Sequence, residues 1–127
     1  MTDKNNKKIL VVDDDENLRL VLTDKLSREG FKVLEASNGK EGLETALKDH
    51  PDIILLDVMM PIMNGLEMLK LLRQDEWGKG IKVIMLTVLE NAEFVAEAVA
   101  DGSFTYLIKT DLDTEDVVKK VEEMLNK

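Results

Sequence analysis

The sequence has no cysteine, and this absence removes several kinds of chemistry at once. Disulfide bonds, thiolate nucleophiles and cysteine-ligated zinc or iron–sulfur sites are all excluded. The single histidine, His50, cannot form a histidine-rich metal site unaided. Any metal bound here is therefore expected to be a hard cation held by oxygen atoms. Aromatic residues make up only 4% of the chain, so valine, isoleucine, leucine and methionine must fill the core.

Basic charge and long apolar runs are also scarce. Lysine and arginine number 17 against 26 aspartates and glutamates, which gives a formal net charge of −9. Because such a surface repels phosphate backbones, we expect no direct binding to DNA or RNA. No apolar run approaches the roughly 20 residues that are needed to cross a bilayer. The run Ile9–Val12 is too short for a signal peptide and leads straight into aspartates, so we expect a cytoplasmic chain without membrane contact.

Five short apolar runs predict five strands. They are Ile9–Val12, Phe31–Ala36, Ile53–Leu56, Ile81–Leu86 and Tyr106–Ile108. Several are continuous and rich in β-branched residues, as is typical of strands covered on both faces. The length of 127 residues fits one domain of ordinary size, and we expect residues 1–127 to form a single domain.

The segments between these runs have helical spacing. Their apolar stripes are Leu18, Val21, Leu22 and Leu26; Leu43, Ala46 and Leu47; Leu66, Leu69 and Leu72; Phe94, Val95, Ala98 and Val99; and Val117, Val118, Val121, Met124 and Leu125. Gly30 stands where a glycine would end the first helix, and Thr114 is a candidate cap for the last. Alternating strands and helices predict an α/β fold of (βα)5 type, with a doubly wound parallel sheet.

Polar side chains follow four of the five predicted strands. They are Asp13, Asp14 and Asp15 after the first strand, Asp57 after the third, Thr87 after the fourth and Lys109 after the fifth. In open parallel sheets the working site lies beyond the carboxyl ends of the strands. We therefore expect these side chains to converge on one edge of the sheet.

The chemistry of this set is coherent. Carboxylates that are brought together repel, and one of them would have a raised pKa unless a cation neutralised them. Mg²⁺ suits this task, with Asp14 and Asp57 as direct ligands and Asp13 bound directly or through water. A carboxylate beside Mg²⁺ can attack a phosphoryl group and form an aspartyl phosphate. Lys109 would supply a second positive charge, and the Thr87 hydroxyl can donate to a phosphoryl oxygen.

Each of these residues has an ordinary structural explanation when it is taken alone. An aspartate at a strand end is usually a turn or helix-cap residue, and Asp15 and Asn17 are both candidates for the cap of the first helix. Thr87 alone fits a strand end, and Lys109 alone fits a solvated side chain. The joint occurrence at four of five strand ends, in an order that suits one chemistry, favours a phosphoryl-transfer site.

These residues stand in segments that resemble bacterial and archaeal receiver domains, the phosphoacceptor modules of two-component signalling. The segments are ILVVDDDENLRLVL, PDIILLDVMMPIMNGLEML, VIMLT and YLIK, and the resemblance covers nearly the whole chain. The second is the most specific, with a proline four residues after Asp57 and an Asn-Gly pair seven and eight residues after it. The resemblance implies a flavodoxin-like fold with strand order 2-1-3-4-5. Pro61, Asn64 and Gly65 are interpreted as structural residues of the loop, with Gly65 permitting a close backbone approach.

The resemblance also implies roles for single residues. Asp57 becomes the phosphoacceptor, and Asp13 and Asp14 become the acidic pair that organises Mg²⁺. The backbone carbonyl of Met59 becomes a further metal ligand. The phosphoryl donor would be a sensor histidine kinase.

A switch is implied as well. Thr87 and Lys109 become the catalytic hydroxyl and ammonium, and the rotamer of Tyr106 would report phosphorylation. A downstream protein or a fused output domain would bind the face formed by the fourth helix, the fifth strand and the fifth helix. The chain would then be no enzyme in the ordinary sense, because it would catalyse only its own phosphorylation and dephosphorylation.

Two positions depart from the family pattern. Thr110 follows Lys109 where the family usually has a proline after a cis peptide bond. Without that proline a cis bond would cost about 2.5–4 kcal/mol, so we expect a trans bond and a differently shaped loop. Val88 stands beside Thr87 where the family favours alanine or glycine. Its branched side chain is expected to narrow access to Asp57 and slow phosphoryl exchange.

Two other functions stay open at this point. A small aspartyl-phosphate phosphatase would need a second aspartate two residues after the nucleophile, where Met59 stands. A pseudo-receiver that serves only for docking or dimerisation is disfavoured by the full polar set, although Val88 and Thr110 leave room for it.

Overall fold

The computed structural model describes residues 6–88 and 105–126, and within these ranges five strands form one parallel sheet. The strands are β1 (Lys8–Val12), β2 (Lys32–Ala36), β3 (Ile53–Asp57), β4 (Lys82–Thr87) and β5 (Thr105–Ile108). Their spatial order is β2-β1-β3-β4-β5, as predicted. Each strand begins and ends within one residue of its predicted apolar run.

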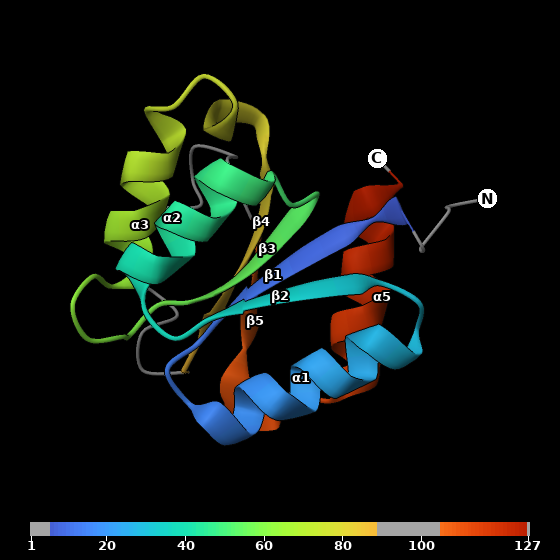
Figure 1. Cartoon of the computed structure of the whole chain (residues 1–127). Coiled ribbons are helices and arrows are strands. Elements are labelled where there is room, and N and C mark those ends of the chain that lie inside the picture. Colours follow the sequence, from blue (N-terminus) through green and yellow to red (C-terminus); the bar gives the residue numbers. More distant parts are fainter. Residues whose placement is uncertain (1–5, 89–104, 127) are drawn as a thin grey trace.

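Helices cover both faces of this sheet. They are α1 (Glu16–Arg28), α2 (Gly39–Asp49), α3 (Gly65–Arg73) and α5 (Thr114–Leu125). Figure 1 shows α2 and α3 on one face and α1 and α5 on the other. The helix predicted around Phe94–Val99 lies outside the described residues. In the part of the chain that is described, no helix is both long and apolar enough to cross a membrane.

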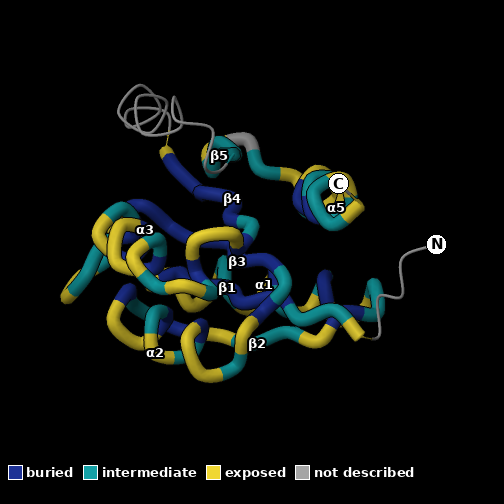
Figure 2. Tube along the Cα trace, turned by 90° about the horizontal axis from the view of Figure 1, so that it is seen from above, coloured by how far each residue is buried: buried dark blue, intermediate teal, exposed yellow. Residues whose placement is uncertain are grey.

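Alternate residues of the central strands fill two separate cores. Leu10 of β1 packs in the core beneath α2 and α3, whereas its neighbour Val11 packs in the core beneath α1 and α5. All five residues of β3 are buried, and Figure 2 shows the central strands enclosed between the helices. The continuous apolar runs in the sequence therefore have the physical cause predicted for them, which is cover on both faces.

The apolar stripes predicted for α1 and α2 include residues that these helices leave exposed. On α1 Leu22 and Leu26 are fully buried, but Val21 is 51% exposed. On α2 Leu47 is likewise exposed, at 38%. Val21 and Leu47 thus belong to the predicted stripes by spacing but lie outside the buried rows of these helices.

The helix ends agree with the prediction in part. Asp15 caps α1, and Gly30 follows this helix with a φ of 102°, a conformation that favours glycine. The prediction that Thr114 caps the last helix was wrong. Asp113 is the N-cap of α5, where its carboxylate accepts the backbone N–H of Glu115.

Candidate functional site

Three buried polar side chains mark the carboxyl edge of the sheet. Asp13 follows β1 and is fully buried, Asp57 ends β3 at 3% exposure, and Thr87 ends β4 and is fully buried. Among the residues that the structure describes, these are the only buried polar or charged side chains. Burial of a polar group costs free energy unless a partner compensates it, so their gathering at one edge points to a functional site.

Lys109 provides a compensating charge. Its Nζ lies 3.1 Å from Asp13 Oδ2 and 3.3 Å from Asp57 Oδ1, and its side chain is only 17% exposed. Lys109 follows β5 and begins a short 3₁₀ turn that continues through Thr110. No cis peptide bond occurs in the described ranges, so the Lys109–Thr110 bond is trans, as expected. The missing proline therefore does not prevent the ammonium from reaching both carboxylates.

Three aspartates form the acidic cluster. Carboxylate oxygens of Asp13, Asp14 and Asp57 lie within 4.8 Å of one another. Asp13 and Asp57 are buried, whereas Asp14 is exposed. Asp13 Oδ2 accepts no hydrogen bond from the described residues, and among them it forms an ion pair with Lys109 alone. The cluster offers only oxygen ligands, and buried Asp13 Oδ2 is available to bind a cation. Such a set fits a hard divalent cation.

Burial raises the pKa of Asp57 to about 7, and the nearby Asp13 carboxylate acts in the same direction. The Lys109 ammonium opposes this rise. Burial also disfavours the charged form of Lys109, but the carboxylates of Asp13 and Asp57 outweigh it, and the pKa of Lys109 is raised. The lysine thus stays protonated while Asp57 titrates near neutral pH.

The loop after β3 is shaped around Asp57. The backbone N–H of Met59 donates to Asp57 Oδ1 at 3.3 Å, and Gly65 donates to the carbonyl of Val58 at 2.9 Å. A Cβ on Gly65 would lie 2.1 Å from the backbone oxygen of Asp57, so the close approach predicted at this glycine is confirmed. Asn64 caps α3 in a reciprocal capping box, which agrees with its structural interpretation.

Thr87 and Tyr106 share one face of the sheet. The Thr87 hydroxyl donates to the Val88 carbonyl at 3.2 Å. In the register of β4 and β5, Met85 pairs with Tyr106 and Thr87 pairs with Ile108, so these side chains project to the same side. Tyr106 is half-buried against the core beneath α2 and α3. Val88 is 37% exposed.

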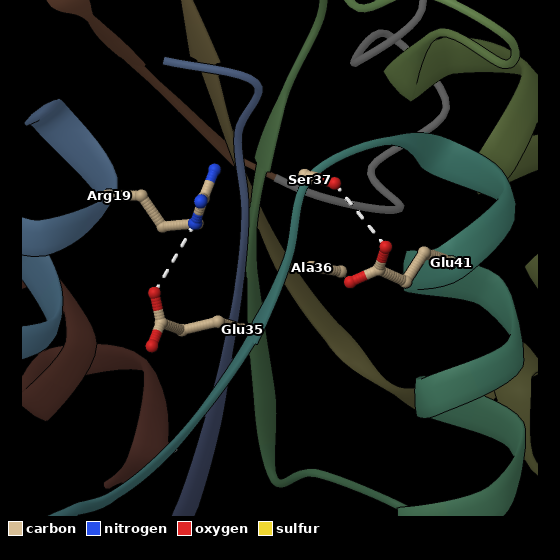
Figure 3. Close-up of a pocket in the computed structure, with 5 residues that line it drawn as sticks. All are labelled: Arg19, Glu35, Ala36, Ser37 and Glu41. Carbon is tan, nitrogen blue, oxygen red and sulfur yellow. Dashed lines mark hydrogen bonds and ion pairs between the residues drawn. The ribbon is translucent and has the colours of Figure 1, made fainter. Parts of the chain in front are cut away.

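The prediction missed Arg19 of α1. Its Nη1 donates to the backbone carbonyl of Asp13 at 2.7 Å, and its Nε donates to Glu35 Oε1 of β2 at 3.2 Å. Figure 3 shows Arg19 and Glu35 beside an open polar hollow of about 250 Å³ that Ser37 and Glu41 also line. A contact between a side chain and a distant carbonyl has no signature in sequence spacing, which is why Arg19 was not singled out.

The sequence matches a known protein family over most of its length. The profile of the response regulator receiver domain matches residues 9–122. This chain belongs to the receiver domain family. It is 36% identical over 117 residues to sporulation initiation phosphotransferase F of Bacillus subtilis, a match that covers 91% of this chain and 93% of that protein.

Solved receiver domains share its fold. The chemotaxis response regulator CheY4 of Vibrio cholerae superposes with a TM-score of 0.84 at 32% identity, covering 92% of this chain and 97% of that one. The flavodoxin-like fold class is confirmed. Some relatives are longer. The regulatory protein AtoC of Escherichia coli is 38% identical over 107 residues, and the match covers 84% of this chain but 23% of AtoC. The chain is a receiver domain of two-component response regulators.

Proposed function

We propose that residues 1–127 form a single receiver domain that accepts a phosphoryl group on Asp57 from the phosphohistidine of a sensor kinase. The observation that carries this proposal is the buried Asp57 carboxylate, which lies in the cluster with Asp13 and Asp14 and 3.3 Å from Lys109. A nucleophile for phosphoryl transfer needs positive charge close to the incoming group. At this edge of the sheet Lys109 supplies one positive charge, and the acidic cluster could hold a cation that supplies another.

The transfer forms one bond and breaks one bond. An oxygen of Asp57 bonds to phosphorus while the bond from phosphorus to the histidine nitrogen breaks, and that nitrogen keeps the electron pair. Asp57 must be ionised to attack, and Lys109 favours the ionised form. Hydrolysis of the acyl phosphate by water restores the carboxylate. The domain thus catalyses only its own phosphorylation and dephosphorylation.

Asp13, Asp14, Asp57 and the backbone carbonyl of Met59 would hold Mg²⁺. Their oxygen-only chemistry and the clustering of the three carboxylates support this assignment. Bound Mg²⁺ supplies the positive charge that offsets repulsion among the carboxylates and among the phosphoryl oxygens. The buried Asp13 and the exposed Asp14, which are consecutive residues after β1, would each supply a carboxylate oxygen.

Lys109 and Thr87 act on the transferred group. Lys109 already bridges Asp13 and Asp57, and its flexible stem lets the ammonium move onto a phosphoryl oxygen. The Thr87 hydroxyl, which now donates to Val88, would turn to donate to another phosphoryl oxygen. Tyr106 lies on the same face of the sheet and would follow Thr87 inward, which alters the surface that β5 and α5 present.

That altered surface would be the output. A downstream protein or a fused output domain would bind the face formed by the fourth helix, β5 and α5. The residues of the fourth helix lie outside the described ranges, so the support comes from β5, α5 and Tyr106 alone. Longer relatives such as AtoC are consistent with a fused arrangement.

Phosphorylation with a small-molecule donor tests the proposal. With acetyl phosphate and Mg²⁺ the wild-type chain should gain one phosphoryl group that alkaline hydroxylamine removes, and Asp57→Asn should gain none. Asp24→Asn is the matched control, since it removes the same charge at an exposed position of α1. Stoichiometric labelling of Asp57→Asn would contradict the assignment. Sustained turnover of a chromogenic phosphomonoester would favour the alternative of a small aspartyl-phosphate phosphatase. Absence of any acyl phosphate would favour a pseudo-receiver that serves only for docking or dimerisation.

A further inference from the structure

The loop between β1 and α1 carries two of the three clustered aspartates. Arg19 of α1 donates hydrogen bonds to two backbone carbonyls of this loop. The backbone N–H of Arg19 donates to the carbonyl of Asp15 at 2.9 Å, and its side chain donates to the carbonyl of Asp13 at 2.7 Å. The N–H of Asp15 in turn donates to Asp13 Oδ1 at 2.9 Å. Asp14 therefore lies between two residues whose backbones Arg19 holds.

The bond to the Asp13 carbonyl has a consequence for Asp14. Because the peptide group is planar, fixing the carbonyl oxygen of Asp13 also fixes the plane that carries the N and Cα of Asp14. The backbone N–H of Asp13 is held as well, since it donates to the Ala36 carbonyl at 3.1 Å. Both peptide groups that flank Asp13 are thus anchored, which fixes the position of the Asp14 Cα relative to the end of β1.

Glu35 braces Arg19 from the neighbouring strand. Its Oε1 accepts from Arg19 Nε at 3.2 Å (Figure 3). Arg19 Nη1 donates to the Asp13 carbonyl, so two hydrogen bonds hold the planar guanidinium. The Arg19 side chain is 17% exposed and that of Glu35 is 41% exposed. A fork with two partners is a geometry that arginine provides and a single ammonium does not.

We infer that Arg19 is a positioning residue for the acidic site: braced by Glu35, it fixes the Asp13–Asp14 peptide plane and so presents the Asp14 carboxylate to Asp57. This inference rests on the proposed function for its meaning in phosphoryl transfer. Its direct consequence is for binding of the divalent cation. Outer-shell partners that orient metal ligands typically contribute about 10–100-fold to metal affinity.

The test is Mg²⁺ affinity of the full chain, measured by calorimetric or NMR titration. Arg19→Met should weaken binding about tenfold, and Arg19→Lys should weaken it less, since the ammonium keeps one of the two bonds. Arg28→Met is the matched control, because Arg28 lies on the same helix, carries the same charge and pairs only with exposed Asp24 in the described structure. Glu35→Gln should lower Mg²⁺ affinity less than Arg19→Met does. Glu41 lines the same hollow but accepts a hydrogen bond from Ser37, so Glu41→Gln should leave Mg²⁺ affinity unchanged.

A second readout separates positioning from a general loss of structure. The phosphorylation rate of Arg19→Met should return toward that of the wild type when the Mg²⁺ concentration is raised. Circular dichroism and urea unfolding without divalent cation should show that the variant is already folded before Mg²⁺ is added, because Mg²⁺ would also rescue an unfolded variant by mass action. If Arg19→Met does not fold, Arg19→Lys decides in its place by the same titration. Wild-type Mg²⁺ affinity in the folded Arg19 variant, or an equal loss in Arg28→Met, would overturn the inference. A wild-type chain that binds Mg²⁺ but never forms an acyl phosphate would refute the proposed function. The Mg²⁺ affinities of the Arg19 and Arg28 variants would still decide whether Arg19 is a positioning residue.

Discussion

The Asp57 carboxyl is subject to two opposing influences, and their balance has measurable consequences. Burial and the Asp13 carboxylate raise the pKa of Asp57 to about 7, whereas Lys109 acts against them. A group with this pKa is half-ionised near neutral pH. At the residue scale, ionisation of Asp57 therefore places unfavourable negative charge beside Asp13, and a bound cation can offset it.

The charge on Asp57 should make folding stability depend on pH. Its pKa rises from 3.8 to about 7 on folding, so the folded state binds the proton more tightly and stability falls as pH rises between these values. Without divalent cation, Asp57→Asn should be more stable than the wild type by about 2–4 kcal/mol at about pH 8. The difference should vanish below about pH 4, where Asp57 is protonated in both states.

Urea unfolding across this pH range checks the prediction. Asp24→Asn, which removes an exposed carboxylate of α1, should show no such trend. A constant difference between Asp57→Asn and the wild type at all pH values would mean that the gain comes from packing and not from charge.

Lys109 should lower the pKa of Asp57. Its Nζ lies 3.3 Å from Asp57 Oδ1, and Lys109→Met removes that positive charge without shortening the stem much. The midpoint of the Asp57 carboxyl, followed by ¹³C NMR without divalent cation, should therefore move above its wild-type value. An unchanged or lower midpoint would show that the ion pair does not form in solution.

At the element scale, the start of α3 is packed directly on the end of β3. A Cβ at Gly65 would meet the Asp57 backbone oxygen at 2.1 Å, so Gly65→Ala must displace the strand end or the helix. We expect a loss of about 1–3 kcal/mol in the free energy of unfolding, together with weaker Mg²⁺ binding.

Gly80 provides the matched control for this substitution. A Cβ there would meet nothing within 4 Å, so Gly80→Ala should change stability by less than about 0.5 kcal/mol. Urea denaturation of both variants measures the contrast. Equal losses in the two would contradict the packing of α3 on Asp57.

Element positions were predictable from sequence where burial leaves a pattern. Strand β3 is buried along its whole length, and its continuous apolar run placed it within one residue. The ends and flanks of helices were harder. Thr114 and Asp113 are both good capping residues, and only the backbone geometry selects Asp113. Val21 fits a helical stripe by spacing but lies where no neighbouring element covers it among the described residues.

The clustering of the candidate site residues was predictable from the sequence, whereas their detailed geometry was not. The strand-end rule and the family resemblance brought Asp13, Asp57 and Lys109 together, and the structure places all three in contact. A raised pKa in the cluster was predicted from the sequence. That the affected carboxyl is Asp57, with a pKa of about 7, could not be predicted, because it depends on burial and on distances between strands. Arg19 was missed because its partner is a backbone carbonyl, which every residue possesses.

At the scale of the whole molecule, a net charge of −9 and a partly buried acidic cluster should make stability depend on Mg²⁺. A cation that binds only the folded state adds about 2.7 kcal/mol at a concentration of about 100 times its Kd. Thermal unfolding should show this gain for the wild type and little of it for Asp14→Asn. Sodium chloride at matched ionic strength is the control, and an equal gain from it would point to general screening.

In the proposed function, the output of the whole molecule depends on a single covalent bond to Asp57. Borohydride reduces an aspartyl phosphate to homoserine, so treatment of the chain after incubation with acetyl phosphate and Mg²⁺ marks the acceptor permanently. Peptide mapping by mass spectrometry should find homoserine at position 57 and leave Asp13 and Asp14 intact. Homoserine at another aspartate, or at none, would contradict the assignment of Asp57 as the phosphoacceptor.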